Sequence, residues 1–353
     1  MIHLSSFEAI HYRGIDGLSL PNLRDVNLIT GATGVGKTAL IEAIWLFMGR
    51  YNPRLLWDAN VQRSTSPTVN PVSELSNKPL ILCGTLYRMG SEERCEWKAT
   101  FEKEAEITWD TVVVTDSGHK IEQHPLVGRL RVWINDAELD ELPYRHNTPK
   151  GLVAYKKTDS AALTIPPCII EGTRWQLEIS GEYLKLYSDM VREGRKDQLK
   201  NAINFILPNI KDVQILTDET EESYLSVITE NDAQLSLKNL GGGVVRLLKL
   251  YLSLFDARYG MVLIDEIENG IHYSVLRSLW DRVRVWTHEW NVQFIATTHS
   301  AECIEAAMEA FADAPSELAI HKLYTGGESG HVKAATFTGE ALKGARNLNL
   351  EVR

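Results

Sequence analysis

Residues 26–38 read VNLITGATGVGKT, a short apolar run followed by a glycine-rich loop that ends in lysine and threonine. An apolar run of this length that meets glycine is typical of a strand buried in a parallel sheet. The loop, residues 31–38, fits the phosphate-binding pattern GxxxxGK(S/T) at every specified position. Its glycines let backbone N–H groups turn towards phosphate, while the lysine and the hydroxyl residue serve the β- and γ-phosphates and Mg²⁺. The cofactor-binding residues predicted here are Gly31, Ala32, Thr33, Gly34, Val35, Gly36, Lys37, Thr38 and Ala39.

A second apolar run lies in residues 261–272, MVLIDEIENGIH. The strand predicted at 261–264 ends in Asp265 and Glu266, and parallel strands deliver such residues to the crevice where nucleotides bind. One acid can hold a metal ion, and its neighbour can act on water. The alternative is a core strand followed by two solvated acids, so other stretches of the chain must decide.

Two further stretches bear on that choice. Residues 292–297, VQFIAT, predict another buried strand, which leads into Thr298, His299 and Ser300. Residues 237–254, LKNLGGGVVRLLKLYLSL, predict a glycine-rich turn and a helix whose N-terminus could hold an anion. Singly, His299 is more often a core or loop histidine, and such glycines are more often a plain helix entry. Their order along the chain, after the phosphate loop, favours a nucleotide site.

In that order the motifs resemble those of ABC-type ATPase heads, and within these the RecF, SMC and OLD (overcoming lysogenization defect) group, often labelled AAA15 or AAA21. The resemblance covers about the first fifty residues and everything from about residue 235 onward. It implies an α/β fold of the P-loop NTPase class, with an ABC-type head whose mixed central sheet is flanked by helices. The matching segments are His11 to Ile15 (opening segment), Gly31 to Thr38 (Walker A), Leu240 to Arg246 (signature), Val262 to Glu266 (Walker B), Asn269 to His272 (D-loop) and Thr297 to Ser300 (switch).

The resemblance also implies a mechanism, in which two heads sandwich two ATP molecules head to tail as a dimer or a higher oligomer. Lys37 and Thr38 would bind phosphate and Mg²⁺, and Asp265 would hold the magnesium through water. Glu266 would polarise the attacking water, and His299 would sense the γ-phosphate. Further nucleotide contacts implied by the family are Gly241, Gly242 and Gly243 of the signature and Arg13 or Tyr12 beside the adenine, although Tyr12 is equally a candidate for a core aromatic.

Two positions depart from the family pattern. Aligned on Arg246, the signature serine falls at Leu240, with Asn239 and Ser236 nearby, so that role rests on the backbone and the glycines. A convincing Q-loop glutamine is absent. Gln62 lies in a plausible connecting stretch, where an ordinary loop residue is the stronger interpretation.

Composition indicates a soluble protein. Of its 353 residues 44% are hydrophobic, enough to bury a large core in one or two domains. Its apolar runs are far shorter than the ~20 residues of a membrane span, and its start has no secretory signal. Four widely spaced cysteines without a CxxC pair predict neither zinc nor disulfides. We therefore expect a cytoplasmic protein without a membrane partner.

The net charge of -10 argues against a general electrostatic hold on nucleic acid. A local groove could still form at Arg192, Arg195, Lys196 and Lys200, which recur at near-helical spacing. A solvated helix face is the more common meaning of such a pattern. DNA therefore stays open as a partner without being favoured.

The predicted domains are a nucleotide-binding lobe, residues 1–50 plus 235–353, and an insertion, residues 51–234. The insertion begins with a stretch rich in Pro, Ser and Asn, which predicts a long loop over 52–78. A β-meander and then a helical lobe follow it. The meander is predicted at 80–87, 95–102, 107–114 and 130–134, and the helical pattern spans 183–207, ended by Pro208 and followed by strands at 213–216 and 224–228 around an acidic loop.

Residues 301–353, after the histidine strand, contain no DxD pair, so we expect an ATPase without a nuclease domain of its own. By resemblance to stand-alone heads of this group, the favoured function is an ATP-gated dimeric switch that controls a separately encoded nuclease or toxin-like effector in anti-phage defence. Two alternatives remain open: a RecF-like DNA repair ATPase that binds DNA in an ATP-dependent way, and the ATPase subunit of a membrane transporter. The opening segment, the long insertion and the switch sequence TTHS weaken the transporter alternative.

Overall fold

The computed structural model of the chain describes residues 2–49, 80–88, 91–102, 112–114, 120–122, 126–134, 137–145, 167–171, 181–205, 207–217, 222–237, 240, 242–326, 330–339, 341–342 and 344. The predictions for the loop at 52–78, for Gln62, for Asn239 and for Gly241 lie outside these residues.

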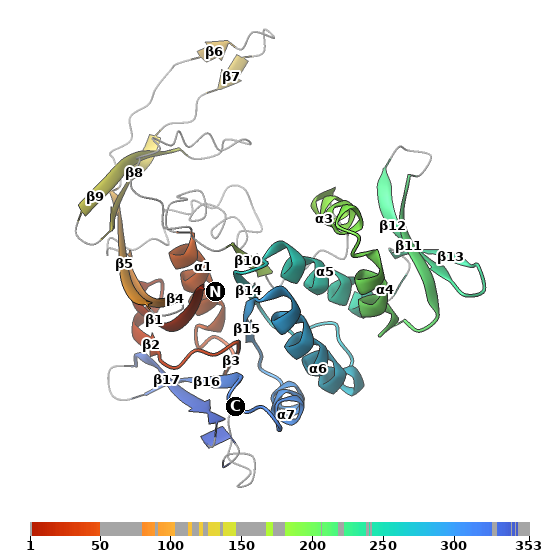
Figure 1. Cartoon of the computed structure of the whole chain (residues 1–353). Coiled ribbons are helices and arrows are strands. Elements are labelled where there is room, and N and C mark those ends of the chain that lie inside the picture. The colour runs from red at the N-terminus through yellow and green to blue at the C-terminus, as the bar shows by residue number, and fades with distance from the viewer. Residues whose placement is uncertain are drawn as a thin grey trace.

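A six-stranded sheet forms the centre of the protein, in the order β10-β14-β15-β3-β16-β17 (Figure 1). Neighbours from β10 to β16 pair in parallel, and β17 pairs antiparallel with β16, which confirms the predicted mixed sheet. Three of its strands are buried along their whole length, which explains their largely apolar sequences. The strands are β3 (Val26–Gly31), β10 (Cys168–Glu171), β14 (Met261–Ile264), β15 (Gln293–Thr297), β16 (Leu318–Thr325) and β17 (Val332–Thr338).

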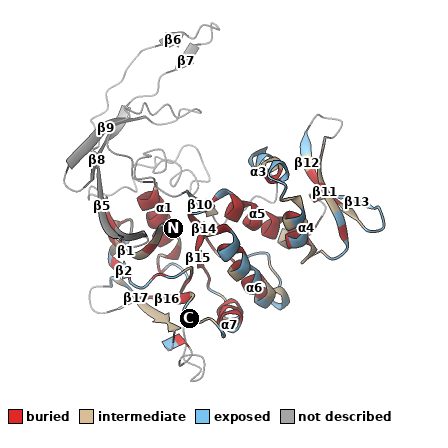
Figure 2. Ribbon diagram, viewed as in Figure 1, coloured by how far each residue is buried: buried red, intermediate tan, exposed pale blue. Residues whose placement is uncertain are grey.

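Helices cover both faces of the central sheet, namely α1 (Lys37–Met48) on one face and α5 (Gly242–Asp256), α6 (Tyr273–Trp290) and α7 (Ala301–Ala310) on the other. Successive strand residues point to opposite faces, so each strand supplies two cores in turn. Figure 2 shows the resulting burial, concentrated where the helices meet the sheet. The flanking helices were predicted and are confirmed.

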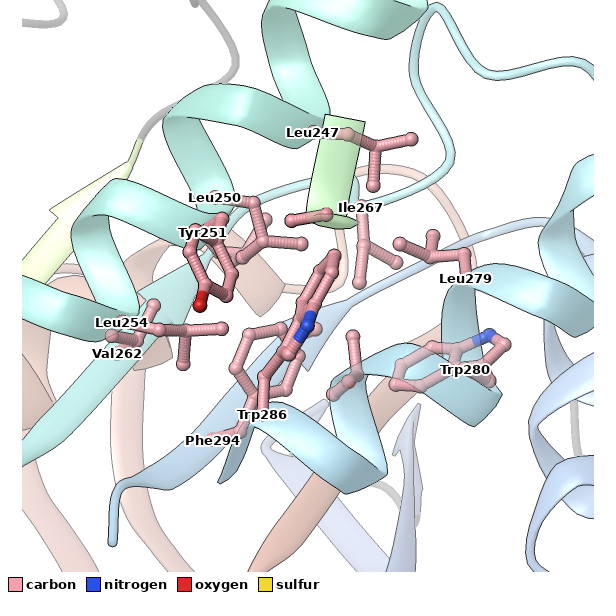
Figure 3. Close-up of a cluster of buried hydrophobic side chains, with 14 of the residues drawn as sticks. Leu247, Leu250, Tyr251, Leu254, Val262, Ile267, Leu279, Trp280, Trp286 and Phe294 are labelled. Carbon is pink, nitrogen blue, oxygen red and sulfur yellow. The ribbon is translucent and has the colours of Figure 1, made fainter. Parts of the chain in front are cut away.

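The neighbours Val262 and Leu263 of β14 illustrate the alternation. Val262 belongs to the core under α5, α6 and α7, whereas Leu263 belongs to the core under α1. Figure 3 shows the first of these cores, in which Tyr251 of α5 packs edge to face on Trp286 of α6, with ring centres 5.0 Å apart. Such aromatic pairs contribute about 0.5–1.5 kcal/mol beyond their buried area. The core therefore holds α5 and α6 firmly to each other above the sheet.

A second six-stranded sheet, antiparallel throughout, has the order β2-β1-β4-β5-β8-β9. The side-chain amide of Gln293, in the central sheet, joins it to the backbone of Leu4, because Nε2 donates to Leu4 O (2.8 Å) and Oε1 accepts from Leu4 N (2.9 Å). The strands of the second sheet are β1 (Ile2–Tyr12), β2 (Ile15–Leu20), β4 (Leu80–Arg88), β5 (Ser91–Glu102), β8 (Leu126–Ile134) and β9 (Ala137–Arg145), and β6 (Val112–Val114) pairs separately with β7 (Lys120–Glu122).

The predicted meander differs from this sheet in its connections. Three of its predicted strands correspond to β4, β5 and β8, while the one at 107–114 is described only as β6 because residues 107–111 lie outside the described part. The meander does not stand alone, since β4 pairs with β1 near the start of the chain. That pairing joins residues far apart in sequence, which local periodicity cannot foresee.

The helical lobe contains α3 (Gly181–Arg192), α4 (Lys196–Asn204) and a three-stranded sheet of β11 (Ile210–Thr217), β12 (Ser223–Thr229) and β13 (Gln234–Ser236). The helical pattern over 183–207 is thus two helices, because Gly194 between them adopts a left-handed φ of 73°. The second helix ends at Asn204, ahead of Pro208. There the Asn204 side-chain amide pairs with the backbone of Ile210, accepting from its N (2.7 Å) and donating to its O (3.2 Å).

Arg192, Arg195 and Lys196, three of the four basic residues predicted as a possible groove, have acidic partners. Arg192 lies 2.6 Å from Asp189, Arg195 lies 3.3 Å from Glu193, and Lys196 lies 2.7 Å from Asp212. Such surface pairs cancel local charge without adding much stability, each contributing roughly 0–1 kcal/mol. The arrangement favours the solvated helix face over a cationic groove.

None of the described helices is both long enough and apolar enough to cross a membrane.

The division into a lobe of residues 1–50 plus 235–353 and an insertion of residues 51–234 stays a prediction. Strands from within 51–234 belong to both of the large sheets that also contain strands of the lobe. β4 adds to the sheet of β1 and β2, and β10 pairs in parallel with β14 in the central sheet. A boundary drawn in sequence therefore cuts through both large sheets.

Candidate nucleotide site

The glycine-rich loop leaves β3 and enters α1 through backbone conformations that suit glycine. Gly31 has a φ of 139°, and a Cβ placed there would lie 2.5 Å from the carbonyl oxygen of Leu323. Gly36, the N-cap of α1, has a φ of 106° and provides no side-chain cap to the helix. The first turn of α1 also contains no acidic residue. Its N–H groups and positive dipole end are therefore left for an anion in the loop.

Lys37 reaches back over this loop. Its Nζ donates to the carbonyl oxygens of Gly31 (2.7 Å) and Ala32 (3.0 Å). Burial lowers the pKa of Lys37, while the nearby carboxylates of Asp265 and Glu266 oppose that effect. The ammonium thus lies inside the loop that is predicted to hold phosphate, facing the acids at the end of β14.

Asp265 connects three parts of the predicted site. Only 2% of this residue is exposed. Its Oδ2 accepts from the Thr38 hydroxyl on α1 (2.8 Å), and its Oδ1 accepts from the Thr297 hydroxyl at the end of β15 (2.5 Å). A hydroxyl and a carboxylate side by side are the oxygen ligands that Mg²⁺ uses when substrate phosphates supply the others. The pair therefore fits magnesium, although the described residues contain no group of three or more metal-binding side chains.

Glu266 sits on a strained backbone next to the loop. Its φ is 51°, in the left-handed region that non-glycine residues seldom adopt and that recurs at functional sites. Three contacts hold this conformation: its N–H donates to the Thr297 hydroxyl (2.8 Å), and its carbonyl oxygen accepts from Nη2 of Arg246 (2.6 Å) and from the N–H of Asn269 (3.0 Å). One third of its side chain is exposed. The carboxylate is therefore open to a water molecule while its backbone is fixed.

His299 lies beside these acids with half of its side chain exposed. Its Nδ1 is 3.8 Å from Oε1 of Glu266 and 3.4 Å from Oε1 of Glu268. The structure thus brings together five side chains that the sequence placed in one site. They are Lys37, Thr38, Asp265, Glu266 and His299. Their individual roles remain predictions.

The glycine-rich helix entry approaches the site from the other side. α5 begins at Gly242, and a Cβ at Gly243 would lie 3.4 Å from the carbonyl oxygen of Gly270. Arg246, four residues after the first residue of α5, donates to the carbonyl oxygens of Glu266 and Asn269. Burial lowers the pKa of Arg246 to about 10, so it stays charged at neutral pH. These hydrogen bonds connect the segment predicted as the signature to the segment predicted as the D-loop in the same chain.

The predicted contacts to adenine are engaged within the protein. Tyr12 is 5% exposed and its hydroxyl donates to Oε2 of Glu42 on α1 (3.1 Å). Arg13 directs its Nε to the same oxygen (3.0 Å). Tyr12 is thus a core aromatic, one of the two alternatives, and the nucleotide role of Arg13 remains a prediction. Leu240, at the position of the signature serine, packs against the core under α5.

Sequence reasoning missed a second acid, the half-buried Glu171 at the end of β10. Its carbonyl oxygen accepts from the N–H of Asp265 (2.9 Å). Its carboxylate accepts from the Ser253 hydroxyl of α5 (2.8 Å) and from the Tyr183 hydroxyl of α3. Burial raises the pKa of Glu171, and these two hydrogen bonds oppose the rise. The signal was available, because CIIE at 168–171 is a short apolar run ending in an acid, like MVLID at 261–265.

Comparison with known proteins agrees with this fold. Residues 145–305 match a family described as an AAA domain, putative AbiEii toxin, Type IV TA system. One solved structure of similar fold is the SMC head domain of Pyrococcus furiosus with an extended coiled coil, bound to the C-terminal domain of ScpA. Its TM-score is 0.58 at 12% sequence identity, and the match covers 99% of this chain and 100% of that one. A second SMC head, bound to the winged-helix domain of ScpA, gives a TM-score of 0.54 at 11% identity over 97% of this chain and 99% of that one. A search among curated proteins found no match.

The fold is that of a P-loop NTPase with an ABC-type head. Within that fold class, residues 145–305 are similar to the AAA family, and the fold of the chain is similar to that of SMC head domains. The resemblance of the motifs predicted this fold, and the prediction of the fold is confirmed.

Proposed function

We propose that the protein binds ATP with Mg²⁺ and hydrolyses it to ADP and phosphate. The observation that carries the proposal is the chain of contacts through Asp265, which joins the loop at Thr38 to the switch at Thr297. A loop, an acid pair and a histidine that converge on one sheet edge meet the needs of phosphoryl transfer, where positioning and charge stabilisation dominate.

Each side chain then has a separate task. Lys37 and the N-terminus of α1 bind the phosphates, and Thr38 with Asp265 holds the magnesium. Bound magnesium would neutralise charge that develops on the phosphate oxygens. Glu266, exposed on a fixed backbone, orients a water molecule and accepts its proton, and His299 contacts the γ-phosphate. Gly242 and Gly243 contact phosphate from the signature side.

We further propose a head-to-tail dimer, or a higher oligomer of the same contacts, in which the signature of one protomer completes the nucleotide site of the other. The bonds from Arg246 to Glu266 and Asn269 support this idea, because they tie the signature helix to the D-loop and acid that would face a partner. A nucleotide bound between two protomers would then contact both of them.

The partner is proposed to be a separately encoded nuclease or toxin-like effector of anti-phage defence, controlled by the ATP cycle. The description of the matched family, which names a putative toxin of a toxin–antitoxin system, supports a protein that works with a partner. The SMC heads of similar fold are themselves bound to ScpA domains. A RecF-like role on DNA is a second candidate, but the paired basic side chains of α3 and α4 give it little support.

Glu266→Gln tests the proposal most directly. The variant keeps the shape of the side chain and removes its basicity, so ATP binding should persist while turnover falls about a hundredfold or more. Light scattering after chromatography with ATP should show the variant as a stable dimer. Glu305→Gln, an exposed acid on α7, serves as the control. Undiminished turnover by Glu266→Gln would overturn the assignment.

The effector proposal has its own experiment. Tagged Glu266→Gln in ATP and wild type in ADP would be purified from cells that also express the neighbouring open reading frame. Retention of a nuclease or toxin-like product by the ATP-bound form supports control by the ATP cycle. ATP-dependent binding to DNA ends without such a partner would instead support the repair function.

A further inference from the structure

Glu268 is a buried acid close to the proposed catalytic residues that has no part in the roles above. It follows Glu266 by two residues, outside β14, yet only 12% of its side chain is exposed. Burying a carboxylate is costly unless hydrogen bonds or opposite charges compensate. The position of Glu268 therefore calls for a physical reason beyond packing.

The hydrogen bond and the close ionic contact of Glu268 both involve His299, while the charges of Arg246 and Lys37 also interact with its carboxylate. Its Oε1 accepts the backbone N–H of His299 (3.1 Å) and lies 3.4 Å from Nδ1 of the imidazole. The other oxygen, Oε2, is buried and makes no hydrogen bond within the described residues. A carboxylate held to both the backbone and one ring nitrogen sets the direction of the ring, as carboxylates do behind the histidines of metal sites. Nε2 is then the nitrogen left to face a phosphate.

Glu266 is the weaker holder of the same ring. Its Oε1 is 3.8 Å from Nδ1 of His299, and its side chain is more exposed than that of Glu268. The two acids thus differ in their surroundings, because Glu268 lies largely buried against His299 and Glu266 is more exposed to solvent. A carboxylate committed to His299 would leave Glu266 free to act on water.

The segment that carries Glu268 is itself fixed. The N–H of Ile267 donates to Thr297 O (3.1 Å), and the N–H of Asn269 donates to Glu266 O (3.0 Å). Arg246 donates to the carbonyl oxygens of Glu266 and Asn269, on either side of Glu268. The strand that delivers His299 and the segment that delivers Glu268 therefore move as one unit.

We propose that Glu268 is a positioning residue, which holds the His299 ring with Nδ1 towards its carboxylate and Nε2 towards the γ-phosphate. The inference rests on the proposed ATP hydrolysis. It goes beyond it by assigning the orientation of His299 to an acid on the D-loop side. Glu268 acts through His299 and touches no substrate itself.

The test is a double-mutant cycle in steady-state ATPase activity. Glu268→Gln keeps an oxygen for the His299 N–H but removes the charge, and should lower kcat about tenfold with KM for ATP changed less than about twofold. His299→Ala should lower kcat at least as far, and the double variant should be no slower than His299→Ala, since the two residues act as a unit. Glu305→Gln should match wild type.

Thermal unfolding and ATP binding are measured on each variant, so that a folding defect is recognised. Glu268→Asp, which keeps the charge on a shorter side chain, should restore part of the kcat lost in Glu268→Gln. Wild-type kcat in Glu268→Gln, or a double variant slower by the product of both single effects, would falsify the inference while leaving ATP hydrolysis intact. Absence of hydrolysis by the wild-type protein would instead overturn the proposed function, and the inference with it.

Discussion

Two neighbouring strands, β10 and β14, end in acids that are held in the same way and yet have different surroundings. Asp265 and Glu171 each accept hydrogen bonds from two hydroxyl groups of other elements. Asp265 faces the phosphate loop and Lys37, whereas Glu171 faces α3 and α5, where burial raises its pKa. Of these two carboxylates at the rim of the sheet, the one that meets the loop is thus suited to chemistry. Beside the helices it serves as a link between the sheet and the helical lobe.

The largest expected effect distinguishes the role of Asp265 from that of Glu171. Asp265→Asn removes the charge that would hold magnesium, so Mg²⁺-dependent ATPase activity should fall about a hundredfold or more. The matched variant Glu171→Gln should keep turnover within about threefold of wild type, because both hydroxyl partners can still donate to its amide oxygen. Steady-state kinetics over a range of Mg²⁺ concentrations measures both. Equal losses in the two variants would end the distinction between them.

Thr297→Val tests the hydroxyl that Asp265 and Glu266 share. Valine keeps the shape but leaves Oδ1 of Asp265 and the N–H of Glu266 without that partner. Unsatisfied buried groups cost about 1–3 kcal/mol each, so the free energy of unfolding should fall by at least that much. Activity should also fall, by about tenfold, as the Glu266 backbone loses one of its three hydrogen bonds. Chemical denaturation and ATPase assays measure the two effects, and Thr297→Ser should recover most of both.

Tyr183→Phe is the corresponding test on the helical side. It removes one of two hydroxyls from Glu171 and is expected to lower the free energy of unfolding by about 1 kcal/mol, with little effect on turnover. A loss of activity as large as that of Thr297→Val would show that the helical link takes part in the chemistry after all. Urea denaturation next to the ATPase assay distinguishes these outcomes.

The smallest effect concerns pH. Burial raises the pKa of Glu171 in the folded protein above the ordinary value of 4.5, so the folded state favours the protonated acid. Stability from this group is therefore present below pH 4.5 and is lost as pH rises through the raised pKa. Glu171→Gln cannot ionise and should gain stability relative to wild type as pH rises from 4 to 8. Thermal unfolding at several pH values measures the trend, and a constant difference would contradict the pKa direction.

The sequence predicted the loop side of this comparison far better than the helical side. Walker A and Walker B are local patterns, and each residue type has a chemical reason at its position, so Lys37, Thr38, Asp265, Glu266 and His299 could be named and do come together. The mixed sheet and its flanking helices followed from the same motifs.

The helical side was not foreseen because its contacts link residues far apart in the chain. Glu171 ends a run of only four residues, and its partners Tyr183 and Ser253 belong to different helices. Periodicity places residues on faces, but it does not reveal which faces meet. Arg246 was used only to align the signature, and its bonds to Glu266 and Asn269 depend on a turn whose shape follows from a left-handed φ at Glu266.

The order of strands in the central sheet has a consequence for how the protein is made. β3, which carries the phosphate loop, pairs Val26 with Phe294 on one side and with Leu318 on the other. A ribosome delivers those partners long after β3 itself, and contacts of such large sequence separation form slowly. β3 can therefore pair with both of its neighbours only after Leu318 has been synthesised. We expect affinity for nucleotide to appear late in folding and to be absent from chains that end before β15 and β16.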